Sequence, residues 1–276
     1  MIDLHSHILY GLDDGPATLD ESLEMCRIGY RDGIRTIVAT PHMLNGVYQN
    51  NRATILSRTR ELNAALSRLG IRNSLPHHSA IRTPHSELQT PNSELRTLNS
   101  ELTILPGADV HLGEDLLGPL KQKRLMTVGN GGKYLLIEFP SHGIPYMAES
   151  ILFRLIAHGM IPIITHPERN PEVGRKPARY YEMIRMGCLG QVTAMSLTGG
   201  FGPEVKRLAE ELLIHRLVHF IASDAHSIDT RPPILTPAIR AASKRVGKEE
   251  AGRMVAEYPQ AILEGKKPNI PQPVPF

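Results

Sequence analysis

Six short apolar runs that alternate with longer amphipathic segments are the feature that most restricts how this sequence can fold. Their shortness and the turn-forming residues around them predict buried β-strands. The predicted strands are Ile2–Leu4, Thr36–Ala39, Leu135–Ile137, Ile161–Ile164, Leu189–Val192 and Phe220–Ala222. The amphipathic segments predict helices over Leu19–Arg31, Arg52–Leu69, Met147–His158, Arg179–Met186, Pro203–Leu213 and Thr236–Arg245. Thr18 and Glu21 have capping-box spacing at the start of the first helix.

This alternation of strands and helices predicts an α/β fold with a parallel sheet. The number of strand–helix units favours a barrel, and an open sheet is the alternative. We expect one domain over residues 1–265, followed by an extended proline-rich tail over 266–276. The prolines after Pro259 argue against a core helix in that last part of the chain.

Residues 76–103 differ from the rest because they repeat a heptad that ends in Ser-Glu-Leu. One apolar residue per heptad cannot form a coiled-coil seam, and Pro84 and Pro91 oppose a continuous helix. We interpret the segment as a low-complexity surface insertion within the domain, and a short partner-binding segment is the alternative.

Potential metal ligands follow the apolar runs at six places along the chain. In parallel α/β folds the C-terminal strand ends meet at one crevice, so we expect these side chains to be neighbours. A single histidine at a strand end is more often a packing residue, but six coordinated occurrences favour a metal site. The candidates are His5 and His7, His42, Asp109 after Ile104–Leu105, Glu138, His166, and Asp224 with His226.

The chemistry of these residues favours a cluster of divalent ions. Imidazoles and carboxylates without thiolates suit Zn, Mn, Fe or Ni. Eight candidates exceed the needs of one tetrahedral ion, which predicts two or three ions that share a bridging carboxylate. Such a cluster lowers the pKa of bound water and neutralises charge on a phosphate ester. Asp13 and Asp14 are either turn residues or a further ligand beside His5 and His7.

Two arginines follow the candidate ligands closely. Arg169 comes three residues after His166, and Arg231 comes five residues after His226. A guanidinium group is suited to bidentate phosphate binding, and a surface role is the alternative for each arginine.

Composition excludes several other classes of function. A net charge of +3 and an aromatic content of 5% without tryptophan argue against nucleic acid as a partner. The sequence contains no apolar run long enough to predict insertion into a membrane. Cys26 and Cys188 cannot form a disulfide framework, so we expect a cytoplasmic protein. Neither cysteine has an arginine six residues later, so the cysteine-phosphatase loop is absent.

The motifs DLHSH, TPH, GAD, IEF, THPER and SDAH together resemble the PHP superfamily, named for polymerase and histidinol phosphatase. Within it the chain is most similar to the bacterial capsule-type metal-dependent protein-tyrosine phosphatases. Residues 5–42, THPERN and ASDAHSIDTRPP support that branch, and the resemblance covers nearly the whole chain except 76–103. It implies a distorted (β/α)7 TIM-like barrel with a trinuclear site, often loaded with Mn or Fe.

Carried over by position, the resemblance implies a role for each candidate residue. His5, His7 and Asp224 would bind one metal ion, His42, Glu138 and His166 the second, and Asp14 with His226 would complete the third site. Arg169 and Arg231 match the family's phosphate-binding arginines, and Asp14 joins them as a catalytic candidate. Asp109 falls at the bridging position, where the family's usual residue is the longer Glu.

The implied reaction is hydrolysis of phosphotyrosine on a protein by a metal-activated water. The implied substrate is the tail of a bacterial tyrosine kinase that controls capsule or exopolysaccharide assembly. The runner-up is a PHP phosphoesterase for a small monoester such as histidinol phosphate. A PHP exonuclease lacks support because the chain has no basic stripe. The Asp109 departure motivates a last alternative, a catalytically weak binding or regulatory module.

Overall fold

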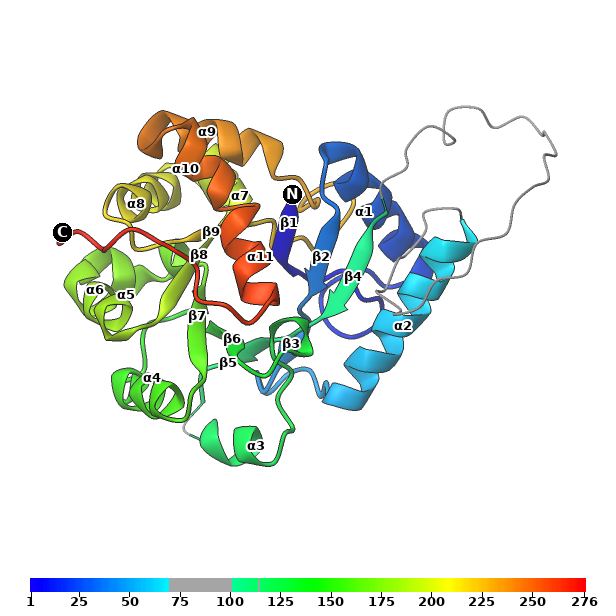
Figure 1. The fold of residues 1–276 in the computed structure, drawn as a ribbon, viewed down its shortest axis with the longest axis horizontal. Helices are drawn as coiled ribbons and strands as arrows, with labels where there is room; N and C mark the ends of the chain where they lie inside the picture. The colour runs from blue at the N-terminus through cyan, green and yellow to red at the C-terminus, as the bar shows by residue number, and fades with distance from the viewer. Residues whose placement is uncertain (70–100, 114) are drawn as a thin grey trace.

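The computed structural model describes residues 1–69, 101–113 and 115–276, which form parallel strands joined by helices (Figure 1). The strands are β1 Ile2–Ser6, β2 Thr36–Ala39, β3 His42–Met43, β4 Thr103–Pro106, β5 Asp109–His111, β6 Tyr134–Glu138, β7 Ile161–Thr165, β8 Leu189–Thr193 and β9 Phe220–Ala222. The longer helices are α1 Leu19–Asp32, α2 Arg52–Arg68, α4 Ala148–Ala157, α6 Pro177–Met186, α8 Pro203–Ile214 and α9 Thr236–Val246. The shorter ones are α3 Leu117–Lys121, η1 Val128–Asn130, η2 Pro167–Arg169, α5 Pro171–Arg175, α7 Ala194–Thr198, α10 Lys248–Arg253 and α11 Glu257–Leu263.

The strands close into a ring that confirms the predicted α/β barrel. One parallel sheet has the order β1-β2-β4 and the other has the order β3-β5-β6-β7-β8-β9. Ser6 bridges Ala225, just beyond β9, which joins the two sheets on one side. On the other side β2 leads directly into β3 and β4 into β5, so each pair occupies a single strand position. Among the described residues the barrel therefore has seven strand positions, as the (β/α)7 prediction requires.

Two strand positions are broken, and the breaks distort the barrel. Pro41 separates β2 from β3, and Pro106 is the last residue of β4. Proline has no backbone N–H group, so the hydrogen-bond ladder between strands cannot continue through it. Gly107 lies at the second break, where an added Cβ would meet Val38 Cγ1 at 2.7 Å. Only glycine therefore lets β4 bend this close to β2. The breaks place His42 and Asp109 inside the short strands β3 and β5, whereas the sequence placed them in loops after a strand.

The core consists of the inner faces of the strands and the helix faces that cover them. All five residues of β1 are buried, and so are the five residues of β8. The capping box predicted at Thr18 and Glu21 is present, and Gly33 ends α1 with a left-handed φ of 99°. None of the described helices combines the length and apolar character that a bilayer crossing requires.

The end of the chain corrects one expectation. Helix α11 continues through Pro259 to Leu263 and buries Tyr258 and Ile262, although the prolines argued against a core helix there. Pro259 lies in the first turn, where a backbone N–H has no intrahelical acceptor, so the helix tolerates it. Residues 266–276 contain neither helix nor strand.

Most of the predicted insertion, 76–100, lies outside the described residues. Its last three residues are described and belong to the fold. Leu102 is buried in the core, and Thr103 begins β4.

Gly190 in β8 has no room for a side chain. An added Cβ would meet Tyr180 Oη at 2.3 Å and the carbonyl oxygen of Leu217 at 2.4 Å. We expect Gly190→Ala to lower the free energy of unfolding by about 1–3 kcal/mol in urea titrations, because the buried neighbours must shift. Gly252→Ala is the control, since its Cβ would meet nothing within 4 Å and alanine favours a helix. Equal unfolding midpoints for the two variants would contradict this packing.

We expect the folded protein to lose stability in mild acid because of His219. Burial lowers the pKa of His219 to about 4, while its Nδ1 accepts a hydrogen bond from the Gly190 N–H. Below the ordinary pKa of about 6.5 the unfolded chain takes up a proton that the folded chain refuses, so stability falls as the pH drops from 6.5 towards 4. His219 should therefore contribute a loss of about 2 kcal/mol between pH 7.5 and pH 5. His219→Asn keeps an acceptor near the Nδ1 position, so its unfolding free energy should depend less steeply on pH; an unchanged slope would refute the assignment.

Candidate metal centre

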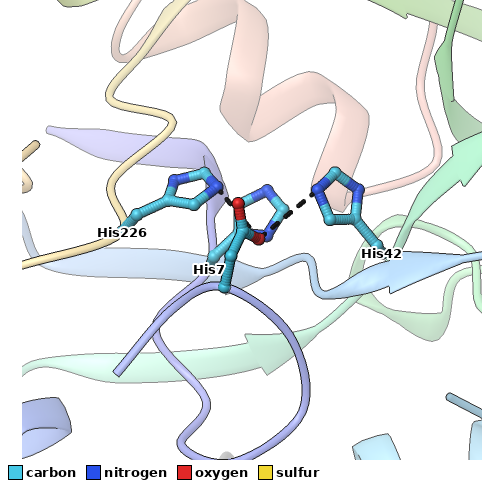
Figure 2. A group of neighbouring side chains, drawn as sticks. His7, His42 and His226 are labelled. Atoms are coloured by element: carbon cyan, nitrogen blue, oxygen red, sulfur yellow. Dashed lines mark ion pairs between the residues drawn. The ribbon is translucent and has the colours of Figure 1, made fainter. Parts of the chain in front are cut away.

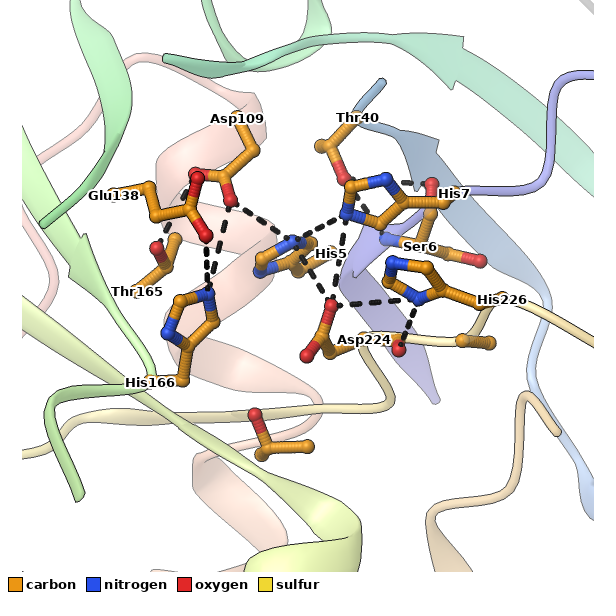
Figure 3. Close-up of polar contacts among 12 residues, drawn as sticks. His5, Ser6, His7, Thr40, Asp109, Glu138, Thr165, His166, Asp224 and His226 are labelled. Carbon is orange, nitrogen blue, oxygen red and sulfur yellow. Dashed lines mark hydrogen bonds and ion pairs between the residues drawn. The ribbon is translucent and has the colours of Figure 1, made fainter. Parts of the chain in front are cut away.

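The predicted ligand segments meet at one rim, where the C-terminal ends of the barrel strands converge (Figure 3). His5 lies in β1, and His7 follows that strand directly. His42, Asp109 and Glu138 lie in β3, β5 and β6, and His166 follows β7. Asp224 and His226 follow β9, and Asp14 lies in the loop before α1. The structure therefore brings together all nine side chains that the sequence selected as ligands.

The first group of ligand atoms contains His5, His7, Asp109 and Asp224. The Nε2 atoms of His5 and His7 are 3.2 Å apart. The Nε2 of His5 lies 3.5 Å from Asp109 Oδ2 and 3.4 Å from Asp224 Oδ1. His7 Nε2 lies 3.6 Å from the same Asp224 oxygen.

The second group contains His42, Asp109, Glu138 and His166. His166 Nε2 lies 3.8 Å from Asp109 Oδ2 and 3.7 Å from Glu138 Oε1. His42 Nδ1 lies 3.4 Å from Glu138 Oε2. His111, in β5, also points its Nδ1 at this Glu138 oxygen, at 3.7 Å.

The third group contains the Asp14 carboxylate and the imidazoles of His7, His42 and His226. Figure 2 shows the three imidazoles side by side. Asp14 Oδ1 lies 3.6 Å from His42 Nε2 and 3.5 Å from His226 Nε2. The His7 ring stacks on the His226 ring with centroids 3.9 Å apart, so this group adjoins the first one. The Asp14 side chain is 49% exposed and forms the open side of the centre.

The spacing and the unpaired atoms of these groups fit metal ions. Ligand atoms about 2.1 Å from a shared ion lie roughly 3.0–3.4 Å from one another, close to the separations observed. Asp109 Oδ2 and His42 Nδ1 are buried and have no hydrogen-bond partner among the described residues. Such orphaned atoms are costly unless something binds them. A cation at each group would satisfy both atoms.

Asp109 spans two groups despite its short side chain. Its ligand atoms group with His5 and His7 on one side and with His42 and Glu138 on the other. The backbone makes this reach possible, because β5 pairs with β3 so that Asp109 lies opposite His42. The other oxygen, Oδ1, accepts a hydrogen bond of 3.2 Å from Thr165 Oγ1, which holds the carboxylate in place. This position is the one that a bridging carboxylate needs.

Hydrogen bonds behind the histidines aim their Nε2 atoms at the centre. His5 Nδ1 contacts Gln191 Oε1 at 2.8 Å, and His7 Nδ1 contacts Asp13 Oδ2 at 2.7 Å. Asp13 also accepts a hydrogen bond from the backbone N–H of His42 at 3.0 Å. Partners of this kind fix the orientation of ligating imidazoles and strengthen metal binding. Asp13 Oδ1 also accepts a hydrogen bond from the Gly15 N–H at 3.1 Å, so Asp13 is a turn residue, which was one of its two interpretations. Its contact with His7 is a supporting role that neither interpretation included.

Sequence reasoning missed Gln191 and Asp3, both of which support the centre. Buried Asp3 accepts hydrogen bonds from the Ser223 backbone N–H at 2.9 Å and from the Ser223 hydroxyl, and so ties β1 to the segment that carries Asp224. Burial raises the pKa of Asp3 to about 6. Two signals were visible in the sequence. Asp3 alternates with His5 and His7 and therefore shares their strand face, and Gln191 is a polar residue inside a buried run.

Two of the candidate ligands adopt left-handed backbone conformations. His166 has a φ of 35° and Asp224 a φ of 52°, values that non-glycine residues seldom adopt. Each residue comes just after its strand, where the conformation turns the side chain towards the rim. Strain of this kind persists where surrounding contacts hold it and is concentrated at functional sites.

Asp224 is the electrostatic centre of the site. Burial favours the neutral acid, yet His5, His166 and Arg231 hold the pKa of Asp224 well below its usual value. Burial, reinforced by the neighbouring imidazoles of His226 and His42, lowers the pKa of His7 far below 6.5. A carboxylate that stays ionised beside a neutral imidazole is the protonation pattern that a metal ion requires.

Both predicted arginines bind the side of Asp224 that faces away from the histidines. Arg169 Nη1 donates to Asp224 Oδ2 at 2.7 Å, and Arg231 Nη2 donates to the same oxygen. The arginine side chains are 31% and 23% exposed, so both reach the rim from a partly buried position. The structure therefore brings both arginines to the centre, in contrast to the alternative of surface side chains.

The cysteines lie away from this chemistry. Cys26 and Cys188 are free and buried, and burial raises the pKa of the Cys188 thiol to about 12. Neither thiol can supply a thiolate near neutral pH.

Comparison with known proteins agrees with this geometry. A family model described as "Capsular polysaccharide synthesis, CpsB/CapC" matches residues 1–79 and 72–264. Tyrosine-protein phosphatase YwqE of Bacillus subtilis is 35% identical over 99% of this chain and 96% of its own length. Tyrosine-protein phosphatase CpsB of Streptococcus agalactiae is 31% identical over 96% of this chain and 98% of its own length.

Solved structures give the same picture of the fold. A crystal structure from a study of YwqE from B. subtilis and CpsB from Streptococcus pneumoniae, described as unique metal-dependent tyrosine phosphatases, matches with a TM-score of 0.86 and 33% identity. The match covers 100% of this chain and 99% of that one. A β-aspartyl dipeptidase from Fervidobacterium islandicum AW-1 matches with a TM-score of 0.51 and 14% identity, a likeness of fold alone.

The support that Asp13 gives to His7 can be tested through metal affinity. We expect Asp13→Asn to weaken Mn²⁺ binding by about 10- to 100-fold, because the amide is neutral and its NH2 group cannot accept from the His7, His42 and Gly15 N–H groups that both Asp13 oxygens contact. Calorimetric titration of the metal-free protein measures this directly. Asp20→Asn, an exposed residue in the first turn of α1, is the matched control and should bind Mn²⁺ as the unmodified chain does. Unchanged affinity in Asp13→Asn would show that His7 needs no such partner.

Proposed function

This chain belongs to the CpsB/CapC family of capsular polysaccharide synthesis proteins, and on that premise we propose that it is a metal-dependent protein-tyrosine phosphatase. The observation that carries the proposal is the meeting of three groups of ligand atoms and two arginines at one rim. Relatives aligned over almost the full length of this chain are named tyrosine-protein phosphatases, which supports the same conclusion.

The ligand groups define how two or three divalent ions would be held. His5, His7 and Asp224 would hold the first, His42, Glu138 and His166 the second, and Asp14 with His226 the third, with Asp109 shared between the first two. We propose Mn as the metal, with Fe and Zn as alternatives that suit the same donors. When bound, such ions supply an activated water near neutral pH and offset the negative charge of the phosphate.

Side chains of this chain would bind the phosphate and orient the water. Arg169 and Arg231 each use one N–H group on Asp224, which leaves further donors to bind the phosphate oxygens. Asp14 is the most exposed carboxylate of the centre, which supports a role for its second oxygen as hydrogen-bond acceptor for the attacking water. The leaving phenolate has a conjugate-acid pKa of about 10, so the reaction needs no strong general acid.

We propose that the substrate is a phosphotyrosine segment of a bacterial tyrosine kinase that controls capsule or exopolysaccharide assembly. The free, buried cysteines agree with a reducing compartment, and we propose the cytoplasm. A phosphatase for a small monoester such as histidinol phosphate remains the second candidate, since the ligand groups suit either ester. The position of Asp109 between two groups favours an enzyme over a binding module without catalysis.

Turnover assays with Mn²⁺ test the proposal. The protein should hydrolyse a phosphotyrosine peptide and leave histidinol phosphate largely intact, and a chelator should abolish turnover while thiol alkylation should not. His42→Ala and Asp224→Ala should each lower kcat by about 10²-fold or more, the usual cost of removing one electrostatic partner of a transition state. His215→Ala, beside the C-terminal tail, is a matched control that should retain full turnover. Activity that survives the chelator and depends on a thiol would refute the mechanism, and preference for histidinol phosphate would refute the substrate.

A further inference from the structure

Phe201 lies against both of the arginines that bind Asp224. The Arg169 guanidinium carbon is 4.7 Å from the centre of the Phe201 ring, and that of Arg231 is 5.7 Å away. Both distances are within the range of a cation–π interaction. Phe201 is half-buried, so its ring lies at the edge of the protein rather than in the core. One neutral ring therefore serves two cations that share a single carboxylate oxygen.

The backbone around Phe201 is held firmly. It lies in a turn between α7 and α8, where the Gly202 N–H donates to the Gly199 oxygen at 3.0 Å. Both glycines have left-handed φ angles, of 92° and 93°, which allow the chain to turn so tightly. An added Cβ at Gly200 would meet Met195 Cε at 2.6 Å, so the turn also packs closely against α7.

The turn is also tied to the segment that carries Arg169. Buried Glu168, the residue before Arg169, accepts hydrogen bonds from the Thr193 N–H at 2.9 Å and from Ser196 Oγ at 2.6 Å. Ser196 belongs to α7, which leads directly into the Phe201 turn. The ring and the arginine therefore rest on one hydrogen-bonded frame.

Two guanidinium groups on one oxygen repel each other, and Asp224 alone carries one negative charge for both. The negative face of an aromatic ring reduces this repulsion without competing for the N–H donors, which remain free for a phosphate. Arg231 Nε is buried and has no hydrogen-bond acceptor among the described residues, so the Phe201 ring offers this guanidinium group an electrostatic partner and not a hydrogen bond.

We propose that Phe201 is a positioning residue that holds Arg169 and Arg231 side by side as a phosphate clamp. This inference rests on the proposed phosphatase function and assigns the turn between α7 and α8 a part in it. The ring acts through the arginines and not through the aryl group of the substrate. It follows that its effect should appear with any ligand that carries a phosphate, inorganic phosphate included.

Binding of inorganic phosphate to the Mn²⁺-loaded protein, measured by calorimetry, tests the clamp without relying on turnover. Phe201→Leu keeps the apolar bulk but removes the π face, and we expect it to weaken phosphate binding about 10-fold, because two cation–π contacts are lost. Phe201→Tyr retains the ring and should bind within about twofold of the unmodified chain. Phe153→Leu, an exposed phenylalanine on α4, is the matched control and should leave affinity unchanged.

A fluorinated series separates electrostatics from shape. Stepwise fluorination of the ring at position 201, introduced by stop-codon suppression, withdraws electron density from its face while nearly preserving its size. Phosphate affinity should fall with each added fluorine, and the urea midpoint should stay constant. In turnover assays with a phosphotyrosine peptide, KM should also rise with each added fluorine.

Three results would overturn the proposal. If Phe201→Leu binds phosphate as tightly as the unmodified chain, the ring does not support the clamp. If affinity is equal across the fluorinated series, the ring acts only through packing. A defect confined to aryl phosphates would show that the ring contacts the substrate itself. If the unmodified chain binds phosphate but does not hydrolyse phosphotyrosine, the proposed function fails while the calorimetric series still decides the clamp.

Discussion

A single buried carboxylate, Asp224, joins the two halves of the site. An unpaired carboxylate in this position would cost several kcal/mol, so its partners decide whether the rim can form. Its Oδ1 faces the imidazoles of His5 and His7, and its Oδ2 accepts hydrogen bonds from both arginines. Because the arginines occupy one oxygen, the other is left to face the histidines. The proposed metal ions and the proposed phosphate site would therefore lie on opposite sides of one carboxylate group.

The distortion of the barrel serves the same rim. A regular strand would carry the chain past the centre, but the breaks at Pro41 and Gly107 turn it inward. After the breaks, β3 and β5 pair so that His42 and Asp109 lie directly opposite each other. This register lets an aspartate reach both neighbouring groups, although its side chain is one methylene shorter than a glutamate. The backbone supplies the reach that the side chain lacks.

A second layer of polar residues holds the ligands in place. Asp13 and Gln191 each contact the far nitrogen of a histidine, and Asp3 links β1 to the segment beyond β9. Phe201 extends this layer to the arginines. Metal sites in general have such hydrogen-bond partners behind the ligands, which fix the orientation of the ligating side chains.

The sequence by itself determined the alternation of strands and helices and the identity of the polar residues after each strand. Those features are local, because burial and strand length leave a short-range pattern along the chain. It missed β3 and β5, which are too short to leave such a pattern, and the helix through Pro259. Only the tertiary structure decided which ligands share a group and which side chains Asp13, Gln191 and Phe201 contact. The His5–Gln191 contact, for example, joins residues 186 positions apart, and no local pattern encodes a partner at that distance.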